Sequence, residues 1–175
     1  MTRRDANDFA LLALPHLDAV YDVALRLTAS HPDAHDLAQE TFLRALRAFG
    51  RLEPGSDVRA WLFTILRNAA RNLRRDGARH STEPFDEESH LAPHPQDEAP
   101  DWYRLTPEVL DAVIAALPWV LREAVVLRDL QGLSYRQIAS VLGCPVGTVM
   151  SRLHRARAAL RKLLAATLEE TRSAP

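Results

Sequence analysis

A group of side chains that can hydrogen-bond with nucleic acid shares one face of a predicted C-terminal helix. Its members are Thr148, Ser151, Arg152 and Arg155, at offsets 0, 3, 4 and 7. Arginine can bind guanine through two hydrogen bonds, and serine or threonine hydroxyls suit phosphates and base edges. The group lies in the N-terminal half of the helix, the part of a recognition helix that meets bases in the major groove. This pattern favours DNA as the ligand.

The elements around this face predict a helix–turn–helix motif. Ser134 and Gln137 fit a capping box for a short helix that runs through Leu142, and residues 143–145 form a tight Gly-Cys-Pro break before the next helix. Two helices joined by such a turn define the motif, and a plain helical hairpin is the alternative. The buried side of the longer helix is predicted to carry Val149, Leu153, Ala156 and Leu160. Its later cations, Arg157, Arg161 and Lys162, suit either phosphate contacts or a solvated face.

A second polar stripe is predicted on a helix in the first half of the chain. Its members are Thr64, Asn68, Arg71, Asn72 and Arg75, beside a core stripe of Leu62, Leu66, Ala69 and Leu73. Amides and guanidinium groups can contact the edges of unstacked bases and hold the backbone of a single strand. An ordinary solvated face explains the stripe equally well.

Two shorter helices are predicted before this one. The first begins near Pro15, and the chain then breaks at His31-Pro32. Asp33 is the predicted N-cap of the second, which ends before the turn at residues 53–56.

Two more helices are predicted between the middle of the chain and the helix–turn–helix. Thr106 is the predicted N-cap of the first, with Pro107 in its first turn. The second runs from Pro118 to about Leu130, and Gly132 ends it.

The charge of the chain is distributed in blocks. Residues 1–80 carry 12 arginines against 10 acidic residues, residues 81–107 carry seven acidic residues against one arginine, and residues 108–175 carry nine basic against six acidic residues. The middle block also holds five of the 11 prolines. We therefore expect an all-α fold of two small helical bundles, 1–80 and 107–175, joined by a flexible acidic linker over 81–106. The basic blocks suggest an anionic partner.

Several other functions are disfavoured. The single cysteine, Cys144, forms no intramolecular disulfide, and we expect it to pack in the core. His90 and His94 lie in the linker without a scaffold for a metal, and Ser151 with His154 lacks the acid partner of a hydrolase. No apolar run is long enough to span a bilayer. We expect a soluble cytoplasmic protein that is not an enzyme and needs no metal or cofactor.

Four segments of the chain resemble the extracytoplasmic-function (ECF) sigma factors of bacterial RNA polymerase, in the sigma-70 family. They are residues 36–42, residues 59–68, residues 133–139 and residues 144–157, the last reading Cys-Pro-Val-Gly-Thr-Val-Met-Ser-Arg-Leu-His-Arg-Ala-Arg. They occur in both halves of the chain and in the family's order. The resemblance implies a sigma-2-like domain over 1–80 and a sigma-4-like domain over 107–175.

The resemblance also implies a role for each group of residues. Core polymerase would be bound by Asp36, Gln39, Glu40 and Arg44. The minus-10 element would be captured, as an unpaired strand, by Leu52 and its loop with Asn68, Arg71, Asn72 and Arg75. The minus-35 element would be contacted by Thr148, Ser151, Arg152, His154 and Arg155. The acidic linker would thread channels of the polymerase that hold nucleic acid, and an anti-sigma factor would control the protein.

Two positions depart from the family's commonest pattern. Met150 stands where many members carry a basic residue, and Leu52 where an aromatic residue often lines the base pocket. The alternative function is that of a stand-alone helix–turn–helix regulator. Such a regulator needs a dimer interface or a ligand domain, and the first half of the chain shows neither a heptad pattern nor an evident pocket.

Overall fold

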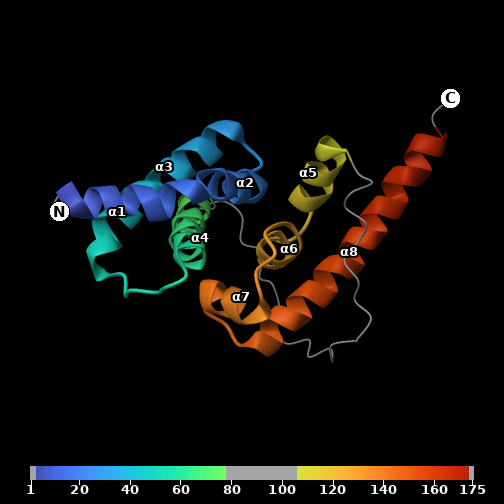
Figure 1. The fold of residues 1–175 in the computed structure, drawn as a ribbon. Helices are drawn as coiled ribbons and strands as arrows, with labels where there is room; N and C mark the ends of the chain where they lie inside the picture. Colours follow the sequence, from blue (N-terminus) through green and yellow to red (C-terminus); the bar gives the residue numbers. More distant parts are fainter. Residues whose placement is uncertain (1–2, 78–105, 174–175) are drawn as a thin grey trace. The chain divides into compact units, whose positions relative to one another are not determined.

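The computed structural model describes residues 3–77 and 106–173, with side chains described over 7–75 and 106–165. Within these ranges every regular element is helical, as predicted (Figure 1). The chain divides into two compact units. The predicted linker, 81–106, lies outside the described residues except for Thr106, and His90 and His94 are therefore not described.

Over residues 3–77, the first unit contains four α-helices and two short 3₁₀ turns. They are α1 (Arg3–Ala13), η1 (Leu14–His16), α2 (Leu17–Thr28), α3 (His31–Ala48), η2 (Phe49–Arg51) and α4 (Val58–Gly77). The core lies where α2, α3 and α4 pack on one another, and its largest fully buried side chains are Leu62, Phe63 and Leu66 of α4. These side chains fix the rotation of α4, and so decide which of its residues face solvent.

Helix α1 was not predicted. Phe9 is its main anchor and packs edge-on against Phe49, with ring centroids 5.4 Å apart, and against Phe42 at 6.4 Å. Leu11 and Leu12 of the same helix are exposed, so its apolar residues do not follow one face. This irregular pattern explains why the periodicity of the sequence does not reveal the helix.

The start of α3 also differs from the prediction. Its N-cap is Ser30 rather than Asp33, because the Ser30 hydroxyl accepts a hydrogen bond from the backbone N–H of Asp33 at 3.4 Å. His31 and Pro32 belong to the first helical turn instead of breaking the chain. Proline is tolerated there because the first N–H groups of a helix have no partner within it.

The described C-terminal part of the chain contains α5 (Pro107–Ala115), α6 (Trp119–Val125), a π-helical segment η4 (Val126–Leu130), α7 (Tyr135–Leu142) and α8 (Val146–Ser173). The predicted cap of α5 is confirmed, because the Thr106 hydroxyl accepts from the Val109 N–H at 3.4 Å. The helix predicted from Pro118 to about Leu130 is observed as α6 followed by η4, and its predicted end is confirmed, since Gly132 has a φ of +71°. Helices α6 and α8 form the main packing contact of this part of the chain.

The predicted helix–turn–helix is confirmed as α7 and α8. The Ser134 N–H donates to Gln137 Oε1 at 2.8 Å, and the Gln137 N–H donates to Ser134 Oγ at 3.3 Å, which completes the capping box. Gly143 ends α7 with a φ of +60°, a conformation that favours glycine. The buried side of α8 carries Val149, Leu153, Ala156 and Leu160, as predicted.

Removing the capping box tests how far α7 depends on it. We expect Ser134→Ala to destabilise the start of α7 by about 1 kcal/mol, because the Gln137 N–H loses its acceptor and the Gln137 side chain loses the hydroxyl that holds it in place. Hydrogen exchange of the α7 amides in the full chain measures this effect. Ser140→Ala, on the exposed side of the same helix, is the matched control and should change exchange little. Equal protection in the two variants would contradict the role of the cap.

The carboxyl group of Glu108 gives a pH-dependent signal at the start of α5. Its own backbone N–H and the Thr106 hydroxyl hold the pKa of Glu108 below its ordinary value. A lowered pKa in the folded state stabilises the helix start above the unfolded pKa, and this stabilisation is lost as the pH falls through the folded pKa. We expect Thr106→Ala to raise the pKa of Glu108, measured by NMR titration. An unchanged titration curve would show that the hydroxyl does not contribute.

Candidate nucleic-acid and polymerase interfaces

The N-terminal half of α8 presents a smaller polar face than the sequence predicts. Thr148, Ser151, His154 and Arg155 are partly exposed, and the Ser151 hydroxyl donates to the Thr148 carbonyl at 3.0 Å. The prediction that Arg152 belongs to this exposed face is wrong, because the residue is only 5% exposed. It lies three residues after buried Val149 and four before buried Ala156, so it belongs to the covered side of the helix.

Arg157 lies on the covered side of α8 as well. Its side chain is 6% exposed and forms a two-pronged ion pair with Asp129 of η4, which is 2% exposed. Nε donates to Oδ2 at 3.0 Å, and Nη2 donates to Oδ1 at 2.5 Å. The interpretation of Arg157 as a phosphate contact is therefore not supported, whereas Arg161 and Lys162 are exposed.

The polar stripe of α4 is exposed over most of its length. Asn68, Arg71, Asn72 and Arg75 all face solvent. Thr64 is half-buried, and its hydroxyl donates to the Ala60 carbonyl at 3.0 Å. On the opposite side Leu62, Leu66 and Ala69 are buried as predicted, whereas Leu73 is 47% exposed. Four amide and guanidinium side chains therefore remain available on one side of a helix whose other side is fixed in the core.

The loop before α4 is held in one conformation by local hydrogen bonds. The Ser56 hydroxyl and N–H both donate to the Glu53 carbonyl, at 2.7 and 3.1 Å, and Gly55 adopts a φ of +83°. Asp57 then caps α4, since its Oδ1 accepts from the Ala60 N–H at 3.0 Å. A loop tied in this way needs little rearrangement to present its side chains.

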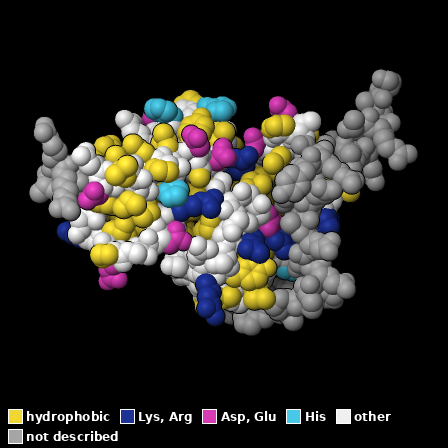
Figure 2. All heavy atoms as spheres, in the orientation of Figure 1, with side chains coloured by type: hydrophobic (Ala, Val, Ile, Leu, Met, Phe, Trp, Pro, Cys, Tyr) yellow, Lys and Arg dark blue, Asp and Glu magenta, His cyan; other side chains and the backbone are white. Residues whose placement is uncertain are grey.

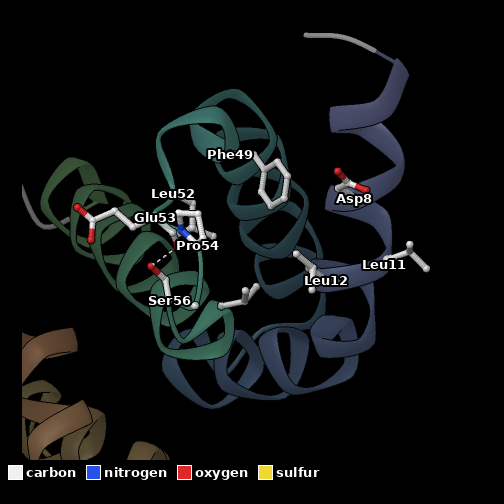
Figure 3. A pocket seen from close by; sticks show the side chains of 10 residues that line it. Asp8, Leu11, Leu12, Phe49, Leu52, Glu53, Pro54 and Ser56 are labelled. Atoms are coloured by element: carbon white, nitrogen blue, oxygen red, sulfur yellow. Dashed lines mark hydrogen bonds between the residues drawn. The ribbon is translucent and has the colours of Figure 1, made fainter.

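A pocket of about 500 Å³ lies between this loop and α1 (Figure 3). Leu52 and Phe49 line it on one side and Leu12 on the other, and Asp8 and Glu53 are also among its lining residues. Leu52 lines the pocket, whereas Asn68 and Asn72 are not among its lining residues. The grouping of Leu52 with the amide stripe of α4 stays a prediction.

Leu11, which lines this pocket, and Leu14, three residues later in sequence, are exposed. Leu11 is 74% exposed and Leu14 51% exposed, and Figure 2 shows hydrophobic side chains on this part of the surface. Sequence reasoning missed this surface because it did not recognise α1.

The predicted polymerase-binding side chains follow one another on the outer side of α3. Asp36 and Gln39 are exposed. Glu40 and Arg44 are partly exposed and pair with each other, with Arg44 Nε donating to Glu40 Oε1 at 2.6 Å. A surface pair at this spacing contributes little to stability, but it holds both charged groups in defined positions.

Comparisons with known proteins identify the same two halves. The family model described as Sigma-70 region 2 matches residues 12–80, and the one described as Sigma-70 region 4 matches residues 108–160. The sigma factor EcfG of Rhodopseudomonas palustris, an ECF RNA polymerase sigma factor, is 39% identical over 90% of this chain and 84% of its own length. The chain belongs to the ECF sigma factors of the sigma-70 family.

Other relatives agree with this assignment. The sigma-H factor of Pseudomonas aeruginosa is 37% identical over 96% of this chain and 92% of its own length. The ECF sigma factor SigE of Mycolicibacterium smegmatis is 39% identical over 91% of this chain, which spans 63% of that longer relative. Among solved structures, the sigma factor RpoE of Bartonella quintana, in complex with the anti-sigma factor NepR, matches with a TM-score of 0.73 and 34% identity over 90% of this chain and 97% of that one. CnrH, in complex with the cytosolic domain of CnrY, matches with a TM-score of 0.66 and 27% identity over 92% of this chain and 90% of that one.

The family matches cover the elements that carry the two polar faces. The region 4 match includes α7 and the part of α8 up to Leu160, and the region 2 match begins at Leu12, near the end of α1. Within the described residues of this sigma factor, no helix has the length and apolar character needed to cross a membrane.

Proposed function

We propose that this chain directs core RNA polymerase to promoters by placing two DNA-binding helices, α8 on the minus-35 element and α4 on the minus-10 element. The observation that carries the proposal is the partly exposed polar face of α8, which lies in a confirmed helix–turn–helix within the region 4 match. In such motifs the second helix enters the major groove with its N-terminal residues foremost.

The minus-35 contacts come from Thr148, Ser151, His154 and Arg155. Arg155 suits guanine, since its guanidinium can donate two hydrogen bonds to one base. Ser151 and Thr148 supply hydroxyls for phosphates or base edges. Arg152 acts differently: its side chain is covered, so it supports the helix in this conformation instead of contacting a base.

The minus-10 contacts come from the exposed stripe of α4. Separating two strands costs about 1.4 kcal/mol of stacking per base-pair step on average. Asn68 and Asn72 can recover part of this cost by hydrogen-bonding to an unstacked base, while Arg71 and Arg75 hold the neighbouring phosphates. Leu52 precedes the N-terminal end of α4 and lines the pocket beside α1, where it offers an apolar surface to a base.

The outer side of α3 binds the polymerase. Asp36 and Gln39 supply exposed acceptors and donors, and the Glu40–Arg44 pair supplies fixed charges of both signs. The two bundles, 1–80 and 107–175, act as separate modules, and the acidic chain between them suits channels that otherwise hold nucleic acid. The protein contributes no catalytic group, metal or cofactor, and works in the cytoplasm, where it meets the polymerase.

An anti-sigma factor is the proposed regulator. The RpoE and CnrH structures, which resemble this chain, each contain a protein partner, NepR or CnrY. By analogy, such a partner would keep this chain from the polymerase until it is released.

Promoter binding with and without core polymerase tests the proposed function. We expect the free chain to bind promoter DNA weakly, because affinity for DNA grows with the number of phosphates neutralised and a single small module neutralises few. With core polymerase, binding should be tight and RNA synthesis should begin at defined sites, mapped by sequencing transcript 5′ ends. Equally tight binding by the free chain would indicate a stand-alone regulator instead.

Replacing the two amides of α4 tests the minus-10 assignment. We expect Asn68→Ala with Asn72→Ala to reduce transcription from a fully paired promoter about tenfold, since each lost hydrogen bond to an unstacked base contributes about 0.5–1.5 kcal/mol. The same variant should transcribe a template that is already unpaired at the minus-10 element with a smaller loss. Asn7→Ala, an exposed asparagine of α1, is the control. Equal losses on both templates would show that the amides do not assist melting.

A further inference from the structure

Asp129 and Arg157 form a buried ion pair that the proposed DNA and polymerase contacts do not use. Asp129 lies in η4 and Arg157 in α8, 28 residues apart in sequence, and their side chains are 2% and 6% exposed. Both guanidinium–carboxylate hydrogen bonds are present, at 3.0 and 2.5 Å. This parallel arrangement allows essentially one relative orientation of the two side chains.

Stability alone is a poor explanation for this pair. Moving two charges out of water is costly, and apolar residues of similar size often stabilise a core equally well or better. The sequence neighbours of the pair are mostly buried apolar residues, Val125, Val126 and Leu127 just before Asp129 and Leu153, Ala156 and Leu160 around Arg157, although Glu123 of α6 and Arg152 of α8 are buried as well. The ion pair adds a fixed orientation of α8 relative to η4, because apolar packing alone tolerates small rotations and shifts of one helix along another.

The pair is close to the polar face of α8. Arg157 follows Arg155 by two residues and Ser151 by six, so it lies about 9 Å along the helix axis from the serine. A rotation or shift at Arg157 is therefore transmitted directly to Ser151, His154 and Arg155. Hydrogen bonding to base edges requires positions accurate to about 0.5 Å.

The residue before Asp129 ties the same segment to the other helix of the motif. Arg128 Nη1 donates to the Leu133 carbonyl at 2.8 Å, and its guanidinium carbon lies 4.8 Å from the ring centre of Tyr135, the first residue of α7. Both residues belong to the π-helical segment, in which the Gln131 N–H donates to the Val126 carbonyl at 3.0 Å. Such segments occur often at functional sites. Two adjacent residues of η4 thus hold the two helices of the helix–turn–helix.

We propose that the Asp129–Arg157 ion pair positions α8 for promoter reading: it sets the rotation and axial position of the helix and thereby how strongly the holoenzyme discriminates between minus-35 sequences. Asp129 and Arg157 contact no DNA in this mechanism and act through Ser151, His154 and Arg155. This inference rests on the proposed function, since it assumes that α8 contacts the minus-35 element.

The test replaces the pair by apolar residues in the full chain, bound to core polymerase. Asp129→Leu with Arg157→Met removes both charges and retains side-chain volume, so thermal unfolding should stay close to that of the parent protein. The readout is the ratio of transcription from a promoter found by mapping transcript starts to transcription from the same promoter with its minus-35 element substituted. We expect this ratio to fall about tenfold, the size of one lost base contact.

Three comparisons separate positioning from stability. A template already unpaired at the minus-10 element, without a minus-35 element, should be transcribed at the parent level, whereas general destabilisation would lower it as well. Asp22→Leu with Arg26→Met removes a partly exposed ion pair of α2, with an Nη1–Oδ1 distance of 3.6 Å, and should leave the ratio unchanged. Arg157→Lys retains the positive charge but not the two-pronged geometry, and its ratio should fall about threefold.

The outcomes are decisive in each case. A ratio within twofold of the parent in both the Leu/Met variant and Arg157→Lys overturns the positioning role. If the Leu/Met variant fails to fold, Arg157→Lys alone decides by the same criterion. If the parent holoenzyme itself shows no dependence on the minus-35 element, the proposed function of α8 fails first and the inference fails with it.

Discussion

A helix that contacts DNA through its side chains must be covered on one side and open on the other, and the covered side must keep it from rotating. Both polar helices of this chain meet this requirement. Leu62, Phe63 and Leu66 anchor α4, and Val149, Leu153 and Ala156 anchor α8. The two helices differ in the composition of their covered sides. The named anchors of α4 are all apolar, whereas the covered side of α8 also includes two arginines, Arg152 and Arg157.

Much of this arrangement could be predicted from the sequence because it depends on local signals. The Thr106 cap, the Ser134 capping box, the glycine at position 143 and the apolar stripe of α8 each involve residues within a few positions of one another. Such interactions form largely from local propensity, so the helix–turn–helix follows from the order of residues alone. The polar stripe of α4 could also be predicted from local spacing. The apolar residues of the helix mark its core face, and the polar residues must then lie on the exposed face.

The features that sequence reasoning missed depend on contacts between distant residues. Arg152 and Arg157 lie at the boundary between the polar and the apolar face of α8. Their positions in the sequence therefore fit either face. Arg157 is buried since Asp129, 28 residues earlier, supplies a carboxylate at that position. Periodicity shows no such partner. Helix α1 was missed for a related reason: Phe9 packs on Phe42 and Phe49, and its exposed leucines obscure the pattern.

The burial of these arginines also affects how strongly the second unit can hold DNA. Salt-dependent affinity comes from cations that reach phosphates, and an arginine paired with a buried carboxylate cannot do so. Arg157 is therefore removed from the phosphate-binding set, Arg152 is covered, and Met150 adds no charge. On the described part of α8, two arginines thus lie on the covered side, where they support the helix and are not available to phosphates. If α8 contacts the minus-35 element as proposed, a module with so few available cations would discriminate between sequences better than it holds them, and a larger assembly would have to keep it on the DNA.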